Sequence, residues 1–71
     1  MPKEVYISGT FYEWNKKKMK YDFYNNKYTI TLKLKKGKYL YKYYIDGKPK
    51  LDNKEPIVRE INGFENNCIE V

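Results

Sequence analysis

Trp14 is the side chain in this sequence best suited to recognise a ligand by stacking. It is the only tryptophan, and it lies between Glu13 and Asn15, just before the three lysines of residues 16–18. Such a polar run is a poor setting for a core residue, so an exposed indole could offer its flat apolar face to a planar or pyranose ring. The competing interpretation is that Trp14 folds back as a lid over a small core, because tryptophan is highly buried on average.

Two polar positions suit the binding of hydroxyl groups. Lys42 lies in the middle of a predicted strand among four tyrosines, where it is either an ordinary surface lysine or a hydrogen-bond donor to a ligand. Asn66, followed by Asn67, opens the last predicted strand, where it either ends a turn or pairs its amide with vicinal hydroxyls. Trp14, Lys42 and Asn66 are therefore the candidate binding residues.

The composition offers little for catalysis. There is no histidine, so a Ser/His or Cys/His nucleophile cannot be built. The single Cys68 excludes an intrachain disulfide and leaves no thiolate cluster for zinc. The nine carboxylates could supply the pair of catalytic carboxyl groups that a glycosidase needs. They are scattered along the chain, however, and are more simply explained as surface charge. We expect no enzyme activity, no catalytic residue, no metal site and no cofactor.

The stretch Tyr28 to Lys48 contains the two longest alternating runs and predicts a central β-hairpin. The first run, residues 28–34, places its apolar residues on one face, and the second, residues 39–45, places Tyr39, Tyr41, Tyr43 and Ile45 together. Gly37 lies in the connection between the runs, where a positive φ costs it nothing. Asp46-Gly47 predicts a second reversal.

Shorter strands are predicted on either side of this hairpin. Residues 4–8 form the first strand, with Val5 and Ile7 inward and its edge uncovered. Later strands are expected at residues 19–21, 48–51, 57–61 and 66–71, and Pro49 restricts the second of these to a short or edge strand. We therefore predict a single domain over residues 1–71, an all-β antiparallel sandwich of six or seven short strands.

The net charge of +6 raises the question of nucleic-acid binding. Fourteen of the fifteen basic residues are lysines spread over turns and strand faces, which suits ordinary solvation and protection of strand edges equally well. The sequence has no apolar run of the roughly 20 residues that span a bilayer and no signal-peptide pattern at its start. We expect a cytoplasmic protein with no membrane partner.

Three motifs together resemble a known family. They are the SGxFxxW-like start of Ser8, Gly9, Phe11 and Trp14, the YKxxxDG hairpin of Tyr41, Lys42, Asp46 and Gly47, and the EPIV of residues 55–58. In this order they resemble the glycogen-binding module of AMP-activated protein kinase β subunits. That module belongs to carbohydrate-binding module family 48, which also supplies N-terminal modules of branching and debranching enzymes. The resemblance covers residues 4–71.

The resemblance implies an immunoglobulin-like sandwich that binds α-1,4-linked glucan, as glycogen, starch or a maltooligosaccharide, through two aromatic platforms with lysine and asparagine nearby. Trp14 matches one platform, Lys42 the lysine and Asn66 the asparagine. Pro49 stands where the second platform is usually tryptophan, and Tyr44 is a candidate to compensate. Asn62 and Phe64 occupy the segment that inserts an apolar residue into the sugar helix, so they are additional candidate contacts.

Two other classes of function compete with glucan recognition. The first is a protein-interaction scaffold with lost or weak sugar affinity, docked on a glucan-active enzyme or a kinase subunit, which Pro49 and the uncovered first strand favour. The second is a nucleic-acid binder that uses exposed tyrosines and lysines.

Overall fold

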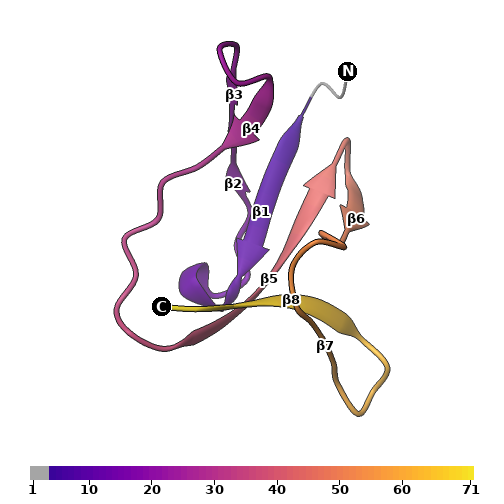
Figure 1. Cartoon of the computed structure of the whole chain (residues 1–71). Helices are drawn as coiled ribbons and strands as arrows, with labels where there is room; N and C mark the ends of the chain where they lie inside the picture. The colour runs from indigo at the N-terminus through magenta and orange to yellow at the C-terminus, as the bar shows by residue number, and fades with distance from the viewer. Residues whose placement is uncertain (1–3) are drawn as a thin grey trace.

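The computed structural model describes residues 4–71, which form antiparallel β-strands and one turn of 3-10 helix (Figure 1). The elements are β1 (Val5–Gly9), η1 (Thr10–Tyr12), β2 (Lys17–Lys18), β3 (Lys20–Asp22), β4 (Lys27–Thr29), β5 (Lys38–Ile45), β6 (Lys48–Lys50), β7 (Ile57–Arg59) and β8 (Glu65–Glu70). The predicted all-β antiparallel class is confirmed, with eight strands in residues 4–71 where six or seven were expected. Among residues 4–71, no helix is long and apolar enough to cross a membrane.

The strands form two sheets, a large one built around β5 and a small one. The large sheet has the order β2-β1-β5-β8-β7, and β6 also pairs with β5. Along one edge, residues 41–45 of β5 pair with β1; along the other, residues 38–41 pair with β8 and residues 43–45 with β6. The small sheet contains β3 and β4. Both edges of β5 are therefore occupied by strands of the large sheet.

The predicted hairpin between residues 28–34 and 39–45 is wrong. Residues 28–29 belong to β4, which pairs with β3, and residues 30–36 form no strand. Since β1, β8 and β6 take both edges of β5, the preceding run has no edge of β5 left to pair with. The chain instead curves widely from β4 to β5, as Figure 1 shows.

The prediction that the edge of β1 is uncovered is also wrong. Lys17 and Lys18 pair with β1, and the Met19 N–H donates to the Val5 carbonyl at 2.8 Å. The next residues leave this sheet, because β3 starts at Lys20 and pairs with β4. Buried Met19 marks the point where the chain changes sheets.

The core lies against one face of the large sheet. Its buried residues are Val5, Ile7, Met19 and Tyr41, with Tyr28, Ile30, Leu32 and Tyr43 packed against them. The inward direction predicted for Val5 and Ile7 and for the Tyr41 face of β5 is confirmed. Burial, followed by the neighbouring Tyr43, raises the pKa of the Tyr41 phenol to about 12.

The Asp46-Gly47 turn has the geometry that its sequence predicts. Asp46 and Gly47 both have positive φ, 49° and 83°, in the two-residue loop that joins β5 to β6. Gly63, at φ 88°, lies in the turn between β7 and β8. β6 pairs only through residues 48–50, which confirms the short strand expected around Pro49.

The buried side-chain amide of Asn67 anchors the loop between β6 and β7 by hydrogen bonds. The side chain is fully buried; its Oδ1 accepts from the Asp52 N–H at 2.8 Å, and its Nδ2 donates to the carbonyls of Asp52 and Pro56 at 2.9 and 3.3 Å. Three hydrogen bonds satisfy the amide, so its burial is compatible with a stable core.

Asn67→Ala should lower the free energy of unfolding by about 2 to 3 kcal/mol, because it leaves buried backbone groups of the loop without partners. Asn66→Ala is the matched control: its side chain has no hydrogen-bond partner within residues 4–71, and the expected loss is under about 1 kcal/mol. Urea unfolding of the two variants provides the comparison. Equal losses would contradict the structural role given to Asn67.

Candidate functional site

Trp14 is held in place by the backbone of the turn that follows β1. Glu13 and Trp14 both adopt the left-handed conformation, with φ of 53° and 64°. The Trp14 N–H donates to the Gly9 carbonyl, and the buried Ser8 hydroxyl donates to the Trp14 carbonyl, each at 2.8 Å. The side chain is 42% exposed and lies outside the core cluster, so the alternative that it covers the core is wrong.

Strand register places the other candidate residues on the sheet face opposite the core. Lys42 is the Cα partner of Ser8, and Tyr44 is the partner of Pro49. Residues directly opposite each other in an antiparallel pair project to the same face. Leu40 pairs with Cys68, so Lys42 and Asn66, two residues further along each strand, share that face too. We call this surface the outer face of the sheet.

Five of the six predicted contact residues line one open depression on the outer face. It has a volume of about 280 Å³ and is lined by Trp14, Lys42, Tyr44, Glu60, Phe64 and Asn66. Phe64 is 63% exposed, whereas Asn66 is only 6% exposed and has no hydrogen-bond partner for its amide within residues 4–71. The depression therefore combines aromatic surface with a lysine and an unpaired amide.

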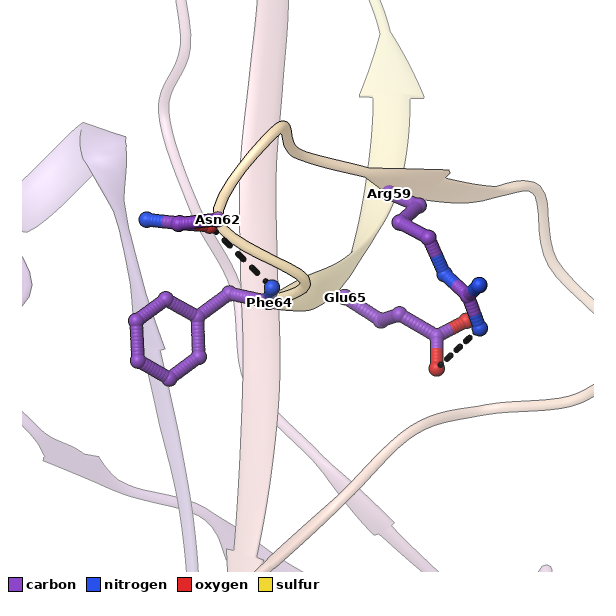
Figure 2. Close-up of polar contacts among 4 residues, drawn as sticks. All are labelled: Arg59, Asn62, Phe64 and Glu65. Atoms are coloured by element: carbon purple, nitrogen blue, oxygen red, sulfur yellow. Dashed lines mark hydrogen bonds and ion pairs between the residues drawn. The ribbon is translucent and has the colours of Figure 1, made fainter.

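The sixth candidate, Asn62, does not line this depression. It lies in the turn before β8, where its Oδ1 accepts from the Phe64 N–H at 3.1 Å (Figure 2). Figure 2 shows the Asn62 side chain and the Phe64 ring on the same side of this loop, with Arg59 and Glu65 on the other side. Arg59 and Glu65 form an exposed ion pair at 3.5 Å. Asn62 thus helps to shape the turn that presents Phe64.

A second depression continues the site toward Pro49. Its volume is about 260 Å³, and its lining includes Lys42, Pro49, Leu51 and Phe64. Because Lys42 and Phe64 line both depressions, the two form one elongated surface. Pro49 lies at the far end of this surface from Trp14.

The polar groups of the site can both donate and accept hydrogen bonds. Lys42 supplies only donors, the Asn66 amide supplies both, and the Glu60 carboxylate accepts. The Lys16 ammonium lies 4.1 Å from the centre of the Tyr44 ring and so covers one of its faces. Tyr44 therefore has one face at most to offer a ligand.

Sequence reasoning missed Ser8 and Glu60. Ser8 belongs to the recognised start motif, but only the structure shows that its hydroxyl fixes the Trp14 carbonyl. Glu60 follows the end of β7 and carries no sequence signal that separates it from other surface carboxylates. Within residues 4–71, no group of three or more histidine, cysteine, aspartate or glutamate side chains could hold a metal ion.

The fold and this face define an all-β module of the binding type, with aromatic and hydrogen-bonding side chains gathered on one sheet face. The chain belongs to the family described as the glycogen recognition site of AMP-activated protein kinase, whose model matches residues 2–71.

Individual relatives agree with this assignment. The chain is 39% identical over 69 residues to the human 5'-AMP-activated protein kinase subunit beta-1 and 38% identical to the mouse subunit beta-2, matching 97% of this chain and 25% of each relative. It is also 36% identical over 66 residues to the chloroplastic PTST homolog 2 of Arabidopsis thaliana, matching 93% of this chain and 12% of that protein. The chain thus spans about a quarter of the length of the kinase subunits.

Ser8→Ala should loosen the turn that carries Trp14, because it removes the one side-chain hydrogen bond to the Trp14 carbonyl among residues 4–71. We expect a stability loss of about 1 kcal/mol and a change in the emission maximum and anisotropy of the single tryptophan. Thr10→Ala is the control, because that hydroxyl accepts instead from the Leu40 N–H. An unchanged indole signal in Ser8→Ala would contradict the positioning role of Ser8.

Proposed function

We propose that this chain binds α-1,4-linked glucan, as in glycogen, starch or a maltooligosaccharide, and acts by binding without catalysis. The observation that carries the proposal is the meeting of Trp14, Lys42 and Asn66 in one depression, although they come from the loop after η1, from β5 and from β8. Membership of a glycogen-recognition family supports the same ligand class.

Each candidate residue has a chemical role that a glucan can use. The indole of Trp14 stacks on the apolar face of a glucose ring. Lys42 donates to sugar hydroxyls, and the Asn66 amide, unpaired within residues 4–71, pairs with two neighbouring hydroxyls. Binding a sugar here satisfies an amide that has no protein partner among residues 4–71.

The shape of the site favours a chain of several sugars over a single ring. The two depressions share Lys42 and Phe64 and extend from Trp14 to Pro49. Phe64 and the Tyr44 face that Lys16 does not cover add aromatic surface to the site. A linear oligosaccharide can contact this whole length. All of its contacts then contribute to affinity, while the translational entropy of the ligand is lost only once.

We also propose a protein partner, a kinase subunit or a glucan-active enzyme. The support is that the similar kinase β subunits carry the matched region within proteins about four times longer. Pro49 in place of a second aromatic platform favours a module whose main role is such docking, with weak sugar affinity. Gel filtration with a candidate kinase subunit, alongside a glycogen pull-down, separates the two roles: comigration without glucan retention would favour the scaffold.

Trp14→Ala should weaken binding of maltoheptaose by about five- to thirtyfold, because a stacked aromatic ring contributes on the order of 1 to 2 kcal/mol. Lys42→Met should cost less, since water readily replaces the amine of a lysine that is only partly buried. Phe23→Ala is the matched control: Phe23 is 85% exposed and follows β3, in the small sheet. Titration calorimetry measures all three variants, and wild-type affinity in Trp14→Ala would contradict the site assignment.

Pro49→Trp should strengthen binding of a linear maltooligosaccharide by roughly 1 to 2 kcal/mol, because it restores aromatic surface at the far end of the site. Pro49 pairs with Tyr44 and is exposed, so an indole there has room on the outer face. Pro49→Ala controls for the loss of proline and should leave affinity nearly unchanged. Weaker or equal binding by a folded Trp variant would mean that the glucan does not extend across the β5–β6 hairpin.

A further inference from the structure

Lys16 covers one face of an aromatic ring in the candidate glucan site. Its ammonium lies 4.1 Å from the centre of the Tyr44 ring, within the distance at which a cation is attracted to an aromatic face. Tyr44 lines the same depression as Trp14, Lys42 and Asn66. Part of the aromatic surface of the site is therefore covered by a cation of the same chain.

The backbone on both sides of Lys16 is held in place, whereas its side chain is free to move. The Asn15 N–H donates to the Tyr12 carbonyl at 3.0 Å, and Lys17 pairs with β1 in the large sheet. The Lys16 side chain is exposed and forms no ion pair within residues 4–71. Its contact with Tyr44 can therefore break without a backbone movement and without leaving a carboxylate unpaired.

Tyr44 is well placed to contact a sugar at the Pro49 end of the site. Pro49 carries no aromatic ring, and Tyr44 is its direct cross-strand neighbour. Such neighbours have Cβ atoms about 4.5 to 5.5 Å apart, so a sugar that reaches Pro49 also comes close to the Tyr44 ring. Tyr44 is half-buried, and the Lys16 ammonium covers one of its two faces. Displacing Lys16 would therefore add stacking surface to this part of the site.

We propose that Lys16 is a displaceable cap on Tyr44, and that a bound glucan displaces it and stacks a sugar ring on the uncovered tyrosine. The inference rests on the proposed function and deepens it, because it names a second stacking ring and the residue that limits access to that ring. An exposed contact between a cation and a ring is weak, and the flexible lysine side chain can return its ammonium to water. The cap therefore lowers the affinity for glucan without closing the site.

The alternative role for Lys16 is to donate hydrogen bonds to the sugar, as proposed for Lys42. The position of the ammonium argues against this role, because a group 4.1 Å above the ring centre occupies the space that a stacked sugar would take. The ammonium and a sugar cannot both lie against that face of Tyr44. The two roles also predict opposite results, since loss of a cap strengthens binding and loss of a donor weakens it.

Lys16→Ala should strengthen binding of maltoheptaose by about two- to fivefold in titration calorimetry, the range expected for loss of an exposed cation–aromatic contact. Lys17→Ala is the matched control: it removes the same charge one residue later, from an ammonium that lies 5.1 Å from the Tyr12 ring, outside the depression. In a Tyr44→Leu background, Lys16→Ala should leave the affinity unchanged. Equal or weaker binding by Lys16→Ala, the same gain in Lys17→Ala, or a gain that persists without the Tyr44 ring would overturn the proposal.

Proton NMR follows the cap itself and separates failure of this inference from failure of the proposed function. The methylene protons next to the Lys16 amine lie over the Tyr44 ring, so the ring current should shift them upfield in the free protein and not in Tyr44→Leu. Saturating maltoheptaose should return them toward ordinary lysine positions and leave the Lys17 signals in place. Ordinary positions in the free protein, or no movement in the complex, would overturn this inference alone. No binding by either wild type or Lys16→Ala would overturn the proposed function and this inference with it.

Discussion

The pairing of β5 along both of its edges is the constraint on which this structure depends. β1 takes one edge, and β8 and β6 share the other. This arrangement buries Tyr41 on the core face and leaves Lys42 on the outer face. It also leaves no edge of β5 for the preceding run at residues 30–34 to pair with. The candidate glucan site is thus a consequence of this pairing.

The outer face carries one nearly buried amide, Asn66, whose side chain has no hydrogen-bond partner within residues 4–71. Asn66 and Asn67 are adjacent and almost equally buried, yet Asn67 makes three hydrogen bonds and Asn66 makes none with its side chain within residues 4–71. Alternation along β8 produces this difference, because one amide projects to the core side and its neighbour to the outer face. The first stabilises a loop; the second remains free for a ligand.

The sequence predicts the strands well but their partners poorly. The inward faces of β1 and β5, the Asp46-Gly47 reversal and the gathering of Trp14, Lys42 and Asn66 on one face follow from local alternation and motif resemblance. The pairing of residues 28–34 does not, because alternation fixes which side chains are buried and not which neighbour takes each edge. The role of Ser8 was equally hidden, since it depends on the left-handed conformation of Trp14.

The central claim is that a single outer face, crossed by β5 and β8, receives the glucan. Titration of isotope-labelled protein with maltoheptaose, followed by NMR of backbone, indole and side-chain amide signals, tests it most directly. We expect the largest shifts at the Trp14 indole, the Asn66 side-chain amide and the backbone of Lys42 and Phe64, with residues 22–34 little changed. Shifts centred on the β3–β4 turn or on residues 30–34, with the Trp14 and Asn66 signals unmoved, would contradict the account.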